Sequence, residues 1–153
     1  GEKCPDDQNA ICYGGRCASR RLQCKQMWGE DTKPSVDSCY KENLCKPLKQ
    51  DVKSEADVFL CQEADVLCGL LHCSVPNFDP KPQSRYNKGF MTAPSKDKKC
   101  MAAYAFYQEG YTPEYYSGMT PDGASCGDGK MCLNQKCVVS PIAPAYKPEP
   151  DSG

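Results

Sequence analysis

The sequence has few of the residues from which most catalytic and metal sites are built. It contains a single histidine, His72, and neither a Cys-x-x-Cys pair nor a His-Glu-x-x-His motif. Structural zinc sites usually combine Cys-x-x-Cys knuckles or paired histidines, and thiol redox enzymes carry Cys-x-x-Cys at a helix start. These absences favour a chain that is not an enzyme and that holds no metal or cofactor of its own.

Long apolar runs and an excess of one charge are missing too. No apolar stretch approaches the roughly 20 residues of a membrane span. The formal net charge of −1 gives no reason to expect nucleic acid or anionic lipid as a partner. The first residue is a glycine followed by polar and charged residues, so no signal peptide is recognisable. We therefore interpret the sequence as a mature protein or as a piece of a longer one.

Cysteine, by contrast, is abundant. Thirteen of the 153 residues are cysteine and only 39 % are apolar, a composition typical of domains that disulfides stabilise. Each disulfide adds about 2–4 kcal/mol by restricting the unfolded chain, and such bonds persist in oxidising compartments. The sequence predicts a disulfide-rich extracellular domain. Structural zinc and redox chemistry are alternatives that the recurring Cys-x4-Cys spacing does not favour.

Helical patterns are short. Ser19 is a suitable cap for a helix in which Cys24, Met27 and Trp28 share one face, and Gly29 is a suitable stop. A second short helix is expected to open at residues 34–35. Residues 54–71 are the most helix-like stretch. Several of their side chains are expected near one stripe or in the core: Val58, Leu60, Cys61, Asp65 and Cys68.

Two regions have the composition of unpacked chain. Residues 76–99 are rich in proline and lysine and predict exposed loops. Residues 139–153 contain four prolines and no cysteine, and they predict a flexible tail or linker. His72 lies between these regions and the helical patterns, and we expect it to be a half-exposed packing residue.

Aromatic residues crowd into one interval. Within residues 101–118 lie Tyr104, Phe106, Tyr107, Tyr111, Tyr115 and Tyr116. Tyrosine suits a recognition surface because it combines a large rigid apolar face and a polar tip with few rotamers to order. The alternative is that these side chains, above all the first three, pack into the core.

The cysteine motifs resemble those of a known family. ICYGGRC at residues 11–17, followed by LQCKQMWG, resembles the CYNGRC…QC…LWG signature of the cysteine-rich domain of ADAM and reprolysin-type metalloproteases, which include the P-III snake-venom enzymes. DVLCGLLHC resembles the family's KCGKLQC, and PDGASCGDGKMCLNQKCV resembles its closing PGTKCGDGKVCxNxxCV. The initial GEKC is similar to the NGxPC that ends the preceding disintegrin-like module. The departures lie between Cys39 and Cys61 and in residues 76–99.

The resemblance implies a disulfide pattern, carried over position by position. The implied pairs are Cys4–Cys17, Cys24–Cys73, Cys39–Cys100, Cys45–Cys61, Cys68–Cys132 and Cys126–Cys137. In the family, the cysteine that matches Cys12 bonds back to the disintegrin-like module, so Cys12 is expected to be unpaired in this chain.

The resemblance also implies a fold. It is a small disulfide-rich α+β domain of the ADAM "wrist and hand" type, with short helices, little strand and long loops. Residues 1–17 would be the wrist segment, residues 18–138 the hand, and residues 139–153 a proline-rich tail.

For function, the resemblance implies a non-catalytic recognition module. The family's hypervariable region corresponds to residues 101–125 and is proposed as an exosite for substrates and adhesion partners. The implied partners are protein substrates, cell-surface receptors such as an integrin or proteoglycan, and the upstream disintegrin-like and metalloprotease domains, to which zinc and calcium would belong. The implied location is extracellular, either secreted or in the ectodomain of a single-pass protein. The alternatives are a purely structural spacer and a free-standing secreted inhibitor or toxin.

Overall fold

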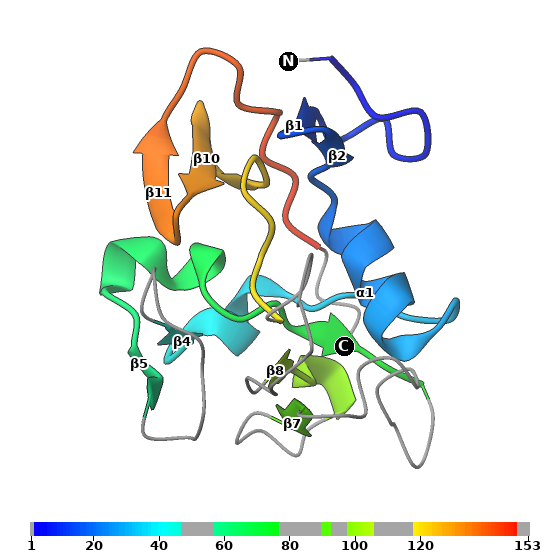
Figure 1. Cartoon of the computed structure of the whole chain (residues 1–153), viewed down its shortest axis with the longest axis vertical. Coiled ribbons are helices and arrows are strands. Elements are labelled where there is room, and N and C mark those ends of the chain that lie inside the picture. Colours follow the sequence, from blue (N-terminus) through cyan, green and yellow to red (C-terminus); the bar gives the residue numbers. More distant parts are fainter. Residues whose placement is uncertain (1, 47–56, 77–89, 93–97, 106–117, 150–153) are drawn as a thin grey trace, which may run out of the picture.

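Short strands and short helices, linked by disulfides, make up the architecture (Figure 1). The computed structural model describes residues 2–46, 57–76, 90–92, 98–105 and 118–149. The helices are α1 (Arg20–Trp28) and the 3-10 helices η1 (Asp37–Tyr40), η3 (Glu63–Cys68) and η5 (Lys98–Cys100). In the described part of the chain, no helix is long and apolar enough to cross a membrane.

Among the described residues, the strands pair in five small antiparallel groups. The largest group is the sheet β9–β10–β11, in which β10 lies in the middle. The other groups are pairs of strands: β1–β2, β3–β6, β4–β5 and β7–β8. Their bounds are β1 Cys12–Tyr13, β2 Arg16–Cys17, β3 Lys33–Pro34, β4 Leu44–Cys45, β5 Phe59–Leu60, β6 Cys73–Ser74, β7 Phe90–Thr92, β8 Ala103–Ala105, β9 Ser125–Gly127, β10 Lys130–Leu133 and β11 Lys136–Val139.

The N-terminal hairpin β1–β2 turns through two glycines. Gly14 and Gly15 have φ angles of +60° and +79°, which glycine adopts without the steric cost that other residues meet. The Cys4–Cys17 disulfide and the Cys4 N–H···O=C bond to Ala10 (3.0 Å) tie the preceding segment to this hairpin. The chain then enters α1.

Helix α1 begins and ends as its sequence predicts. The Ser19 hydroxyl accepts a hydrogen bond from the Leu22 N–H (3.1 Å) and donates one to Asp7 (2.6 Å), and Gly29 follows the last turn with φ +114°. The buried face carries the predicted side chains and packs in the main apolar cluster. That cluster is Cys24, Met27, Trp28, Leu71, Cys73, Val75 and Met101.

The prediction of one long helix over residues 54–71 is wrong for the part that the structure describes. Residues 59–60 form strand β5 and pair with β4, and a 3-10 helix, η3, follows. Leu60 is 66 % exposed, so its predicted place in the core is also wrong. The Cys45–Cys61 disulfide lies beside this hairpin, so cross-links and strand pairing outweigh helix propensity. The second expected helix is present only as the short 3-10 helix η1. It begins at Asp37, and Pro34, where the sequence predicts that the helix opens, belongs to strand β3.

The proline-rich tail makes tertiary contacts that its composition did not predict. After β11 it returns toward β2 and α1 (Figure 1). Arg21 forms an ion pair with Glu149 (3.2 Å), Lys147 donates to the Asn9 side chain (2.9 Å), and the Tyr146 hydroxyl donates to Asp37. Burial and the neighbouring carboxylate raise the pKa of Tyr146 to about 12. Residues 146–149 therefore lie against the N-terminal part of the chain.

Six disulfides are present, and they coincide with the six pairs that the family resemblance implies. Cys12 is exposed and carries a free thiol. Three of the bonds join residues 49 to 64 positions apart. Bonds that close such long loops restrict the unfolded chain most.

Candidate functional site

The backbone on either side of the aromatic interval is held by one short strip of chain, residues 69–74, which we call the central strip. On the entry side, Cys73 and Met101 exchange two backbone hydrogen bonds of 2.7 and 2.9 Å. On the exit side, the Leu71 N–H donates to Gly118 O (3.0 Å) and the Thr120 N–H donates to Gly69 O (2.8 Å). The chain therefore leaves and rejoins the domain at neighbouring positions of the same strip.

Two disulfides fix the entry side further. Cys24–Cys73 joins the central strip to α1, and Cys39–Cys100 joins η1 to the residue before Met101. The hydroxyl of Ser35 donates to Lys99 O (2.5 Å), and its N–H donates to His72 O (3.0 Å). The start of the aromatic interval is thus covalently and non-covalently attached to two helices.

His72 is buried, so the prediction of a half-exposed side chain is wrong. Its residue is only 6 % exposed. Its Nε2 lies 2.8 Å from Asn43 Oδ1, and its Nδ1 lies 3.3 Å from Cys100 O. Burial lowers the pKa of His72, which the hydrogen bond to Cys100 opposes only in part. The ring is therefore neutral near pH 7, and a neutral imidazole carries a proton on only one of its two nitrogens.

Asn43 orients this ring. Its amide nitrogen donates to Val66 O (2.6 Å) and Leu70 O (2.9 Å), so its oxygen must face His72. That oxygen also accepts from the Leu44 N–H (2.9 Å). His72 Nε2 is consequently the protonated nitrogen of the neutral ring, since the Asn43 oxygen can only accept. Nδ1 donates to Cys100 O only when the ring is charged.

Tyr40 supports the same residue from the other side. Its hydroxyl accepts from the His72 N–H (3.1 Å) and donates to His72 O (3.3 Å). The two rings meet edge to face, with centroids 4.7 Å apart. Burial raises the pKa of Tyr40, which keeps the hydroxyl protonated and able to donate. Sequence reasoning missed this network because His72 is 32 positions from Tyr40 and 29 positions from Asn43.

Of the predicted recognition residues, the structure describes one, by its backbone. Tyr104 lies in β8 and pairs with Met91 of β7. The others lie outside the described residues: Phe106, Tyr107, Tyr111, Tyr115 and Tyr116. The choice between an exposed surface and core packing for these side chains stays a prediction.

Comparison with known proteins identifies the family. The family model for the ADAM cysteine-rich domain matches residues 1–114. The chain belongs to the ADAM family. The disintegrin and metalloproteinase domain-containing protein adm-2 of Caenorhabditis elegans is 31 % identical over 144 residues, which are 88 % of this chain and 15 % of that protein. The disintegrin and metalloproteinase domain-containing protein 22 of Mus musculus is 31 % identical over 145 residues, 90 % of this chain and 15 % of that protein.

This chain therefore spans about 15 % of the length of the curated relatives it matches. In ADAM proteins the cysteine-rich domain is a non-catalytic part, carried together with disintegrin and metalloproteinase domains in an extracellular or membrane-anchored ectodomain. The family match ends before the closing motif at residues 121–138.

One stretch of this ADAM domain matches the letters of the catalytic pattern Gly-x-Ser-x-Gly. Residues 123–127 read Gly-Ala-Ser-Cys-Gly, as in a nucleophile elbow. That elbow needs a strand-to-helix turn and a base beside the serine. Here Ser125 begins a strand, its buried hydroxyl has no hydrogen-bond partner in the described part of the chain, and the ring of His72 faces Asn43 and Cys100. The spacing matches, but the structural context of a catalytic serine does not.

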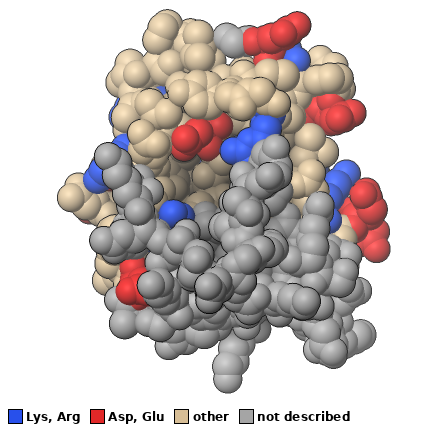
Figure 2. Space-filling view, viewed as in Figure 1, with Lys and Arg blue, Asp and Glu red and all other residues tan. Residues whose placement is uncertain are grey.

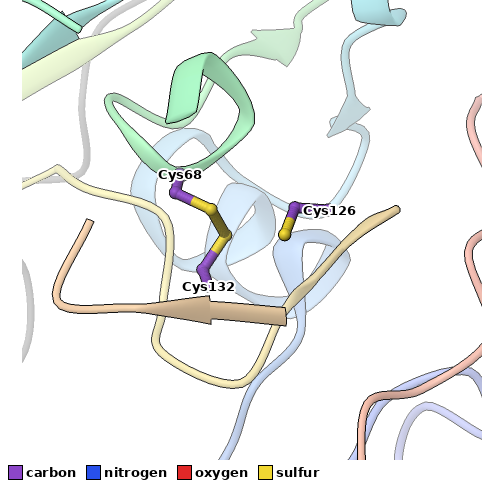
Figure 3. A group of neighbouring side chains, drawn as sticks. All are labelled: Cys68, Cys126 and Cys132. Atoms are coloured by element: carbon purple, nitrogen blue, oxygen red, sulfur yellow. A yellow bond between two sulfur atoms is a disulfide. The ribbon is translucent and has the colours of Figure 1, made fainter. Parts of the chain in front are cut away.

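One group of side chains has the composition of a metal site. The sulfurs of Cys68, Cys126 and Cys132 lie within 4.8 Å of one another (Figure 3). All three are oxidised, in the disulfides Cys68–Cys132 and Cys126–Cys137. Zinc binds cysteine as thiolate, so in this oxidised state the group is a pair of adjacent disulfides and not a set of ligands.

Charge is distributed without a dominant sign on the visible face. Figure 2 shows basic and acidic side chains interspersed among the described residues, in keeping with the net charge of −1. Long-range steering of a partner by charge of one sign is therefore not expected of this face.

Proposed function

We propose that this ADAM cysteine-rich domain recognises protein partners through residues 101–125. The partners would be substrates of the parent protein or cell-surface receptors, for which an integrin and a proteoglycan are candidates. Cleavage would be carried out by a zinc metalloendopeptidase domain elsewhere in the parent, while this chain contributes binding and no catalytic residue. The place of action would be outside the cell.

The attachment of Met101 and of residues 118–120 to the central strip carries this proposal. Loops held by a rigid scaffold commonly bind partners, because the scaffold fixes their ends and lowers the entropy lost on binding. Here the fixed points are the two backbone hydrogen bonds between Cys73 and Met101 and the backbone hydrogen bonds that Gly118 and Thr120 make with the central strip. The concentration of tyrosine between these points supplies suitable contact residues.

The test is a triple substitution in the full-length parent: Tyr111→Ser, Tyr115→Ser and Tyr116→Ser. We expect cell adhesion or cleavage of a protein substrate to fall by about tenfold or more, as for the loss of interface hot spots. Cleavage of a short peptide by the parent's own protease domain should not change. A matched control is Phe59→Ser with Leu60→Ser, which removes two exposed apolar side chains outside the interval, 52 % and 66 % exposed.

A structural spacer is the second candidate, and the docked tail favours it. Glu149 and Lys147 bind Arg21 and Asn9, so the last described residues are held against the N-terminal part. A spacer would hold the parts before and after it in one arrangement. In that case the triple tyrosine variant keeps full adhesion and cleavage, whereas Arg21→Ala with Lys147→Ala changes the arrangement of the parent's domains in small-angle scattering.

A further inference from the structure

Four cysteines form two disulfides that lie side by side. Cys68–Cys132 joins η3 to β10, and Cys126–Cys137 joins β9 to β11. The sulfur of Cys126 lies beside the other bond, and the sulfurs of Cys68, Cys126 and Cys132 are all within 4.8 Å of one another (Figure 3). A thiolate released at Cys126 would thus already be beside a second disulfide.

The fourth cysteine completes an alternative pairing. Cys137 is the direct cross-strand partner of Cys132 in the antiparallel register of β10 and β11. Directly opposed residues project to the same face, with Cβ atoms about 4.5–5.5 Å apart. That separation is close to what a disulfide needs. Both bonds of the alternative pattern, Cys68–Cys126 and Cys132–Cys137, therefore join residues that are already neighbours.

We propose that these four cysteines form a thiol–disulfide exchange site. An external thiol, either a small-molecule thiol or a protein dithiol, would convert Cys68–Cys132 and Cys126–Cys137 into Cys68–Cys126 and Cys132–Cys137. This inference does not depend on the proposed recognition of partners. It concerns the covalent structure of the domain itself.

The exchange takes three steps and balances without an oxidant. The external thiolate attacks the sulfur of Cys137, which is half-buried, forms a mixed disulfide there and releases the Cys126 thiolate. The Cys126 thiolate attacks the sulfur of Cys68 and releases the Cys132 thiolate. That thiolate attacks Cys137 in the mixed disulfide and expels the external thiolate. Each step forms one S–S bond and breaks one, so the external thiol is regenerated.

Arg20 gives the middle step its direction. Its Nη2 lies 3.8 Å from the sulfur of Cys132 and 2.7 Å from Leu67 O, while Nη1 donates to Ser125 O (2.5 Å). The guanidinium is thus held beside one particular sulfur. A nearby cation stabilises a thiolate, and the more stable thiolate leaves faster. Attack on Cys68 with departure of the Cys132 thiolate is therefore favoured over attack on Cys132 with departure of the Cys68 thiolate.

The exchange would change how residues 101–125 are attached. Cys126 follows this interval directly and is now joined to β11. In the alternative pattern it would be joined to η3, which also neighbours the central strip. The concentration of thiols around the domain would therefore determine to which element the chain is bonded directly after residues 101–125.

The first test uses the full chain with a catalytic amount of glutathione, quenched by acid and mapped by mass spectrometry without reduction. We expect peptides that join Cys68 to Cys126 and Cys132 to Cys137 beside the native links. Native links accompanied only by glutathione on Cys137 or Cys126 would overturn the proposal.

The second test stalls the exchange after its first step. In the Cys137→Ala variant, Cys126 starts as the free thiol, and alkylation at pH 8 should place label on Cys132 as well as on Cys126. Cys12 is a free, exposed thiol and takes label in every variant. Apart from Cys12, label confined to Cys126 contradicts the exchange. The matched control is Cys61→Ala, in which the freed Cys45 should keep the label, because in the described part of the chain no such group of sulfurs includes it.

The third test concerns Arg20. In the Cys137→Ala background, Arg20→Gln should lower the label on Cys132 relative to Cys68 by about fivefold or more, the effect of removing a unit charge roughly 4 Å away. Arg20→Lys should retain most of the preference. Equal labelling ratios in both variants would overturn the role given to this charge.

Discussion

Asn43 is the residue whose replacement tests the support of the central strip most directly. Its side chain is 2 % exposed and makes four hydrogen bonds. Two are donated to Val66 O and Leu70 O, and two are accepted from the Leu44 N–H and His72 Nε2. Asn43→Ala leaves four polar groups without these partners. At about 1–3 kcal/mol for each unsatisfied buried group, less what relaxation and entering water recover, we expect a loss of about 3–5 kcal/mol.

The assay is urea unfolding at pH 7 with the disulfides intact, followed by the fluorescence of Trp28, the only tryptophan and a buried one. The matched control is Asn9→Ala, an exposed residue whose side-chain oxygen accepts one surface hydrogen bond from Lys147. We expect the control to lose less than about 1 kcal/mol. An Asn43→Ala loss as small as that of the control would refute the view that this network supports the strip.

Two further changes follow from the structure. Because burial lowers the pKa of His72 below 6.5, the unfolded chain binds more protons than the folded one below that pH, so the free energy of unfolding falls as pH drops through 6.5. Urea midpoints from about pH 5 to 8 should show this His72 component in the wild type and lose it in His72→Gln; an identical pH profile in both contradicts it. Gly123→Ala should destabilise by at least about 2 kcal/mol, since φ is +96° and the new Cβ would lie 2.8 Å from Tyr13 Cβ and 2.9 Å from Ala18 Cβ. Gly129→Ala, at φ +68° in open space, should cost only about 1 kcal/mol. Both losses are measured by urea unfolding, and equal losses would refute the packing argument.

The features that sequence reasoning predicted well are local or belong to a family pattern. Ser19 and Gly29 bound helix α1 because capping depends on neighbours within one turn. The family and its disulfide-rich fold were recognised from short motifs around the cysteines, and the family model bears this out. Residues 54–71 show where such reasoning failed. Their apolar spacing suits a helix, yet β5 pairs with the earlier strand β4, and Leu60 is exposed.

The candidate site was predicted only as an interval. Its composition pointed to residues 101–125, but nothing in the local sequence indicated how the domain holds them. His72 has an ordinary sequence environment, and its burial arises from Asn43 and Tyr40, which lie on other elements. The tail likewise has the composition of a linker, while its contacts with Asn9 and Arg21 span more than 120 positions.

By itself, the sequence determined that this chain would depend on disulfides, would begin its one described α-helix at Ser19, and would carry an ADAM cysteine pattern. These outcomes follow from composition and from interactions between near neighbours. Only the tertiary structure decided that residues 69–74 hold both ends of the aromatic interval, that His72 is buried against Asn43 and Tyr40, and that two disulfides lie within exchange distance. Those outcomes depend on residues that are remote in the chain, whose proximity is set by packing and cross-links and not by local preference.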